Sequence, residues 1–328
     1  MTKIIAVINA KGGVSKTTTT ANLAYVLAKQ GKKVLCVDWD SQASLTNCLN
    51  VGLRENEEYN GVYEFMMHEL RPIKPEEDEF LSKCTFEELL DSCICRPTYT
   101  KRVSKIIDGK KEIVDEEVEF GFDLMPSHIM LADYELTLTQ NKSGADGFRL
   151  YKALHKVCES SHKYDYIFLD CSPGMGLLNM NAIAAAFAVL IPTNLDLMST
   201  RGVENLIEKV AEIQELLLKM DPPIYHYGII GVSLSLYRER RAVDTAIETN
   251  LKQFYPIVTF DSKIPESVDA KKAVYAGLLY SQVSTKAEKA YIALSKEIEK
   301  QIKKMEKEGP KILHLEPNEN RMIGDNNA

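Results

Sequence analysis

The sequence lacks the features that would mark a membrane-spanning, low-complexity or disulfide-stabilised protein. No run in its 328 residues approaches the roughly 18 consecutive apolar residues that a transmembrane helix needs. Glycine and proline are not in excess, and no internal repeat is present, as in ordinary globular proteins. The seven cysteines form no regular framework, which suits a reducing cytoplasm. The N-terminal apolar run has no cleavage signature, so we interpret it as a buried strand and not a signal peptide.

Charge and length set further limits. The formal net charge of −7 argues against a protein that coats nucleic acid with its whole surface, although it permits a local basic patch. The length allows one large α/β domain or two modest ones, with a substantial core.

Apolar runs alternate with segments of helical periodicity along most of the chain. The runs predict strands at residues 3–9, 33–38, 122–125, 166–170, 188–192, 227–236 and 257–260. The periodic segments predict helices at residues 16–30, 179–186, 202–219, 241–254 and 285–307. This order predicts an α/β fold with a mostly parallel sheet and helices on both faces.

Two regions depart from this alternation. Residues 98–120 form two alternating runs around Asp108-Gly109, which predicts a β-hairpin. We interpret about 54–121 as an insertion in a single domain of residues 1–308. The polar end, residues 309–328, is predicted to be a disordered tail.

A glycine loop joins the first predicted strand to the first predicted helix. In this context backbone N–H groups and the helix N-terminus are suited to hold phosphates. Lys16 is placed to reach the β- and γ-phosphates of ATP, and the Thr17 hydroxyl to bind Mg²⁺. The predicted nucleotide-binding residues are Lys11, Gly12, Gly13, Val14, Ser15, Lys16, Thr17 and Thr18.

The loop departs from the generic G-x-x-x-x-G-K-[ST] pattern, because Ala10 and Ser15 stand where glycines are expected. With its additional Lys11, it resembles the deviant Walker A motif of the ParA/MinD family of ATPases. The resemblance implies a P-loop NTPase-like fold and an ATP-sandwiched homodimer, in which Lys11 reaches the phosphates of the partner's ATP. A Cβ at Ser15 is expected to strain the loop and to weaken nucleotide binding or slow hydrolysis.

Two acidic motifs support the resemblance. Residues 38–42 (DWDSQ) resemble the family's D-x-D-P-Q switch, which implies that Asp40 orients the attacking water and that Asp38 lies near Mg²⁺. An aspartate cap on the following helix is the alternative interpretation of this segment. Asp170 ends an apolar run like a Walker B strand, which implies a role in holding Mg²⁺. Residues 171–178 resemble the family's second switch loop.

Further similarity extends to the partition ATPases within the family. Residues 231–241 (GVSLSLYRERR) resemble a partition-type motif, and residues 263–265 resemble an x-I-P turn. The resemblance implies nonspecific DNA binding by the ATP dimer and stimulation by a ParB-like partner. Glu266 stands where partition proteins often carry arginine. The candidate DNA-binding residues are Arg238, Arg240, Arg241, Lys271 and Lys272, for which solvated helix surface is the alternative interpretation.

The last predicted helix carries an apolar face formed by Ala287, Tyr291, Leu294, Ile298 and Met305. We expect this face to pack on the domain's own sheet and expect no membrane partner, because the rest of the helix is dense in both lysine and glutamate.

These inferences lead to one hypothesis and two alternatives. The leading hypothesis is a bacterial cytoplasmic partition ATPase, nucleoid-associated when it binds DNA, with slow and partner-stimulated hydrolysis. The alternatives are a MinD-like membrane-associated positioning ATPase and a regulatory nucleotide-binding protein with weak hydrolysis.

Overall fold

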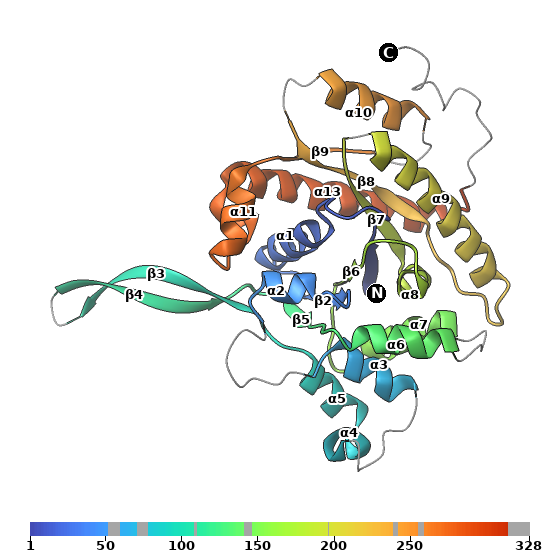
Figure 1. The fold of residues 1–328 in the computed structure, drawn as a ribbon, viewed down its shortest axis with the longest axis horizontal. Coiled ribbons are helices and arrows are strands. Elements are labelled where there is room, and N and C mark those ends of the chain that lie inside the picture. The colour runs from blue at the N-terminus through green and yellow to red at the C-terminus, as the bar shows by residue number, and fades with distance from the viewer. Residues whose placement is uncertain are drawn as a thin grey trace.

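A seven-stranded parallel sheet forms the centre of the protein in the computed structural model (Figure 1). The structure describes residues 1–51, 60–70, 78–107, 110–140, 146–195, 197–238, 242–254 and 259–313. The strands of the sheet lie in the order β5-β2-β6-β1-β7-β8-β9, and every neighbouring pair is parallel. Their bounds are β1 Lys3–Val7, β2 Val34–Trp39, β5 Asp123–Met125, β6 Tyr166–Cys171, β7 Ala188–Asn194, β8 Ile229–Tyr237 and β9 Thr259–Pro265. The predicted mostly parallel α/β fold is confirmed.

The inner strands are largely continuous apolar runs because helices cover both faces of the sheet, whereas β9, at the edge of the sheet, alternates between buried and more exposed residues. All six residues of β2 and all six of β6 are buried, so neither strand shows the alternation of a half-exposed strand. One core lies under α1 Lys16–Lys29, α2 Ser44–Cys48, α12 Tyr280–Val283 and α13 Thr285–Glu308, with α11 Val268–Tyr275 beside α12. Among the described residues, eight helices cover the other core: α3 Val62–Leu70, α4 Glu79–Lys83, α5 Phe86–Cys93, α6 Leu131–Gln140, α7 Arg149–Glu159, α8 Leu177–Ala185, α9 Leu197–Leu218 and α10 Ala242–Phe254. A short 3₁₀ helix, Asp146–Phe148, precedes α7.

Helix α13 packs as predicted. Its apolar face, including Tyr291 and Leu294, is fully buried against α1, β8 and β9. The described residues include no helix that combines the length and the apolarity needed to cross a bilayer.

One local prediction needs correction. Residues 263–265, which resembled a turn, are the last three residues of β9, because Leu234 and Tyr237 of β8 pair with them. Within the predicted insertion, α3 belongs to the core. Its side chains Val62, Phe65 and Met66 are fully buried, and α3 contacts β2, α5, α6 and α7.

The predicted hairpin is confirmed, and it extends far beyond the body of the protein (Figure 1). Strands β3 Thr98–Ile107 and β4 Lys110–Glu119 pair antiparallel over their whole length, and the predicted turn residues Asp108-Gly109 lie outside the described residues. At the base, the ring of Phe120 lies 4.9 Å from that of Tyr99 and 6.5 Å from that of Tyr25 in α1. The predicted tail, residues 309–328, lies outside the described residues from 314 onward.

Candidate functional site

The glycine loop follows β1 and ends where α1 begins, at the carboxyl edge of the parallel sheet, where α/β folds bind ligands. Gly13 adopts a φ of 74°, which favours glycine. Ser15 adopts a φ of 66°, also in the left-handed region. The expectation of a strained backbone at Ser15 therefore has a structural basis, at a cost of roughly 1 kcal/mol for a residue with a Cβ.

Lys16 is folded back over the loop. Its ammonium group donates to the carbonyls of Asn9, at 3.3 Å, and Lys11, at 3.1 Å. Burial lowers the pKa of Lys16, and the nearby carboxylate of Asp170 partly opposes this shift. An incoming phosphate would offer the ammonium a charged acceptor in place of two carbonyls.

Asp170 is the second-to-last residue of β6 and lies beneath the first turn of α1. Its carboxylate accepts hydrogen bonds from the hydroxyls of Thr17, at 2.8 Å, and Thr20, at 3.1 Å. Burial raises the pKa of Asp170, and these two hydrogen bonds act in the opposite direction. The strand end and the phosphate loop are thus joined through side chains that can also ligate a hard cation.

Asp38 lies beside Asp170, because the two residues are register partners in the β2–β6 pair. One carboxylate oxygen of Asp38 accepts from the backbone N–H and the hydroxyl of Thr46, at 2.8 and 2.7 Å. Burial and the charge of Asp170 raise the pKa of Asp38. Two neighbouring buried carboxylates with raised pKa values form a site that a divalent cation would stabilise.

Asp40 is almost fully buried in the loop after β2. Its Oδ1 accepts from the backbone N–H of Gln42 at 3.0 Å, which fixes the side chain. The loop then turns into α2 through Ala43, which adopts a φ of 51°. A cavity of about 420 Å³ lies between this loop and residues 126–129.

The second switch loop contacts both the phosphate loop and the first switch. The Gly174 N–H donates to the carbonyl of Ala10 at 3.0 Å. The Asn179 amide donates to the carbonyls of Ser172 and Gly174, at 2.9 Å each, and so holds the loop in shape. Trp39, between the two carboxylates of the first switch, donates its indole N–H to the carbonyl of Leu178 at 2.7 Å.

Sequence reasoning missed several of these residues. Thr20 lies three residues after Thr17, and this spacing places both hydroxyls on one helix face. Asn9 donates to the Pro192 carbonyl and accepts from the Lys11 N–H, so it ties the loop to β7. The contact between Trp39 and Leu178 joins segments 139 residues apart, which spacing along the chain cannot reveal.

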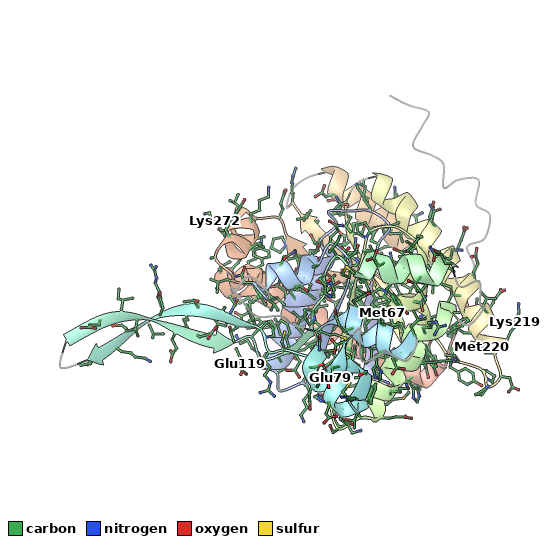
Figure 2. The ribbon with its side chains drawn as sticks, turned by 60° about the horizontal axis from the view of Figure 1, so that its bottom comes forward. Met67, Glu79, Glu119, Lys219, Met220 and Lys272 are labelled. Atoms are coloured by element: carbon green, nitrogen blue, oxygen red, sulfur yellow. The ribbon has the colours of Figure 1, made fainter. Side chains whose placement is uncertain are left out.

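The three candidate DNA-binding residues that the structure describes, Arg238, Lys271 and Lys272, differ in their surroundings. Arg238 makes a bidentate ion pair with Glu266. Lys271 and Lys272 are exposed on α11, and Figure 2 shows Lys272 at the edge of the molecule. The Lys272 ammonium lies 3.7 Å from the carboxylate of Asp269. The remaining two candidates, Arg240 and Arg241, lie outside the described residues.

Comparison with known proteins agrees with this geometry. A family model described as an AAA domain matches residues 2–221. The chain is 30% identical to the sporulation initiation inhibitor protein Soj of Bacillus subtilis, over 91% of this chain and 98% of Soj. It is 25% identical to the chromosome partitioning protein ParA of Caulobacter vibrioides, over 90% and 93% of the two chains. The septum site-determining protein MinD of Pyrococcus horikoshii, solved with Mg-ADP, shares the fold with a TM-score of 0.57, at 20% identity over 93% of this chain and 99% of MinD.

Proposed function

The chain belongs to the ParA/MinD family of P-loop ATPases, and on that premise we propose that it is an ATP-dependent dimerising switch in plasmid or chromosome partition. In this proposal the ATP-bound dimer binds DNA nonspecifically and leaves it after hydrolysis. The names of Soj and ParA support partition as the process served. We propose that hydrolysis is slow and is stimulated by a ParB-like protein. We also propose that the protein acts in the bacterial cytoplasm, on the nucleoid.

The residues present fit ATP and Mg²⁺. The observation that carries the proposal is the buried Asp170 carboxylate, which accepts from the hydroxyls of Thr17 and Thr20 directly beneath the phosphate loop. Mg²⁺ would supply charge neutralisation at the β- and γ-phosphates. Thr17 and Asp170 would hold it, and Asp38 would lie next to Asp170.

Three further side chains complete the proposed chemistry. Lys16 would exchange its two carbonyl acceptors for phosphate oxygens. Asp40, fixed by the Gln42 N–H, would hold the attacking water in line. Lys11, whose own backbone N–H is held by the Asn9 side chain, would reach the nucleotide of the partner subunit.

DNA binding is proposed to use α11 and the neighbouring end of β8. Lys271 and Lys272 are exposed there, whereas the ion pair with Glu266 offsets the charge of Arg238. A contact that neutralises few phosphates has a shallow salt dependence, because log K falls by about 0.9 per phosphate neutralised for each unit of log salt.

The test is DNA binding with ATP and with ADP, each at two salt concentrations. Binding that requires ATP and weakens with salt supports the proposal, and equal binding with ATP and ADP contradicts it. Lys16→Ala should lose nucleotide binding, and normal ATP affinity in that variant would refute the site assignment. Asp40→Ala should accumulate an ATP-bound dimer, so a monomer in ATP would refute the sandwich.

One observation favours a second candidate, a regulatory nucleotide-binding protein with weak hydrolysis. Ser15 holds a left-handed φ of 66° in the phosphate loop, where a Cβ is unfavourable. ATP turnover measured alone, with DNA and with a partition partner separates the two candidates. Turnover that neither addition stimulates favours the regulatory protein.

A further inference from the structure

Among its described side chains, the ribbon formed by β3 and β4 exposes two large apolar ones. Ile106 is 80% exposed and Ile113 is 76% exposed. Figure 2 shows Glu119 at the base of the ribbon and the paired strands projecting away from the body. An isolated two-stranded ribbon is at best marginally stable in water, so a ribbon of this length with exposed isoleucines is expected to have a binding partner.

Both isoleucines lie on the same face of the ribbon, which we call the isoleucine face. Side chains alternate between the two faces of a strand, and the register pairs Ser104 with Ile113 and Ile106 with Lys111. The two isoleucines are therefore diagonal neighbours, close enough for one partner surface to cover both. From base to tip the isoleucine face presents Thr98, Thr100, Arg102, Ser104 and Ile106 on β3, opposite Glu119, Glu117, Asp115, Ile113 and Lys111 on β4.

Each face of the ribbon carries an ion pair of its own, Lys105 with Glu116, at 3.3 Å, on the opposite face and Arg102 with Asp115, at 3.4 Å, on the isoleucine face. The two faces therefore differ in exposed apolar area and not in unpaired charge. Val103 and Val114 face each other on the opposite face and are half-buried. Among the described side chains of the ribbon, the large apolar groups that remain exposed thus lie on the isoleucine face.

The charge of the ribbon excludes a polyanion as a suitable partner. Residues 98–119 carry five basic side chains, Lys101, Arg102, Lys105, Lys110 and Lys111. They carry six acidic side chains, Asp108, Glu112, Asp115, Glu116, Glu117 and Glu119. DNA and anionic lipid would meet as much repulsion as attraction, so neither suits this surface.

We propose that the isoleucine face binds the same face of a second copy of this chain. Along β4 this face reads Lys111, Ile113, Asp115, which is complementary to itself in the reverse direction. When two ribbons stack antiparallel about a two-fold axis at Ile113, the two Ile113 side chains meet. Each Lys111 then faces Asp115 of the second copy, which is also paired with Arg102 of its own chain at 3.4 Å.

The same arrangement suits β3. Ser104 is directly opposite Ile113, so the two Ser104 side chains also lie at the axis. Each Ile106 then lies over the aliphatic stem of Arg102 of the second copy. The contact is isologous, with the same patch on both copies, so it closes as a dimer. It uses none of the nucleotide-binding residues and is independent of the proposed ATP sandwich.

Sedimentation equilibrium of the full chain, without nucleotide and with EDTA, tests the proposal. The wild type should form a dimer as concentration rises. Ile106→Thr combined with Ile113→Thr keeps β-branched residues in both strands, and it should weaken this dimer ~10-fold or more. Leu216→Gln, at an exposed apolar position on α9, is the matched control and should leave the dimer unchanged. A wild type that stays monomeric, or a double variant with unchanged affinity, overturns the proposal.

Cross-linking tests the register. A short bismaleimide should link two copies of Ser104→Cys in the absence of nucleotide, because these residues lie at the axis. Thr100→Cys lies on the same face but four residues farther from the axis, so it should cross-link no more than the wild type with its seven native cysteines. Equal cross-linking of the two variants overturns the register. If the double isoleucine variant also binds DNA more weakly than the wild type, the isoleucine face is a polyanion site and the proposal is overturned.

Discussion

Replacing Asp170 with asparagine should stabilise the nucleotide-free protein while weakening its response to Mg·ATP. Asp170 is 1% exposed and lies beside Asp38, and burial raises the pKa of both carboxyl groups. The charged form of Asp170 is therefore a cost to the folded state. Asparagine has almost the same shape, and its amide can both donate to and accept from the hydroxyls of Thr17 and Thr20.

The size of the gain follows from the pKa shift. Each unit by which folding raises the pKa of a carboxyl group costs ~1.4 kcal/mol once the pH exceeds the raised value. Folding raises the pKa of Asp170 from 3.8 to about 7, which corresponds to a cost of ~4 kcal/mol at pH 8. A neutral amide makes weaker hydrogen bonds to Thr17 and Thr20 than a carboxylate does, so we expect Asp170→Asn to gain about 2 kcal/mol at pH 8. The penalty is absent below the ordinary aspartate pKa and grows as the pH rises toward the raised value. The gain should therefore shrink steadily as the pH falls from 8 to about 5.

Urea unfolding in EDTA, followed by circular dichroism, measures this difference. Addition of Mg·ATP should make the wild type more stable than Asp170→Asn. A ligand at 100 times its Kd adds ~2.7 kcal/mol to the free energy of unfolding of the wild type, and it adds much less to a variant that has lost a metal ligand. Asp123→Asn is the control, since Asp123 accepts from Tyr164 and pairs with Arg96, and its loss should bring no gain. An Asp170→Asn variant less stable than wild type at pH 8 in EDTA would refute the reasoning.

Three further substitutions test other parts of the structure. Ser15→Gly should stabilise the protein by about 0.5 kcal/mol in urea unfolding and should raise ATP turnover. Glycine relieves ~1 kcal/mol of backbone strain in the folded state, and the greater freedom of the unfolded chain offsets part of this gain. Ser15→Ala is the control and should change neither the stability nor the turnover. His128→Gln should cost about 0.5–1 kcal/mol in urea unfolding at pH 6 and less at pH 8.5. The hydrogen bond to Glu64 raises the pKa of His128, so this stabilisation is present at low pH and is lost as the pH rises through the raised value; an equal cost at both pH values would contradict it. Leu294→Ala should cost about 2–5 kcal/mol by thermal or urea unfolding, because the side chain is fully buried under the sheet; a cost below 1 kcal/mol would mean that α13 is not part of the core.

The strands and the phosphate loop could be predicted because their signals are local. The apolar run of β6 is short, fully buried and followed by Asp170, and the loop before α1 carries its glycines and lysine within a few residues. Helix α3 was not predicted as a core element. Its buried positions Val62, Phe65 and Met66 span barely one turn, which is too short for a clear helical period.

Side-chain pairings between distant segments were beyond sequence reasoning. The pairing of Arg238 with Glu266 depends on how β8 and β9 align, and that register shifts twice along the pair. Likewise, Asp38 and Asp170 become neighbours only through the parallel pairing of β2 with β6. Each residue could be assigned a role by resemblance, but their mutual repulsion follows from the fold alone.

The hydrogen bond from Trp39 to Leu178 has a practical consequence. Trp39 is the single tryptophan of the chain, so the intrinsic indole fluorescence of the whole protein arises between Asp38 and Asp40. Its indole N–H donates to the carbonyl of Leu178, which is the last residue of the second switch loop and lies in the first turn of α8. Any rearrangement that parts the two switches breaks this bond and changes the polarity around the ring. The unlabelled protein thus carries its own optical probe at the junction of both switches, suited to stopped-flow recording of a single turnover.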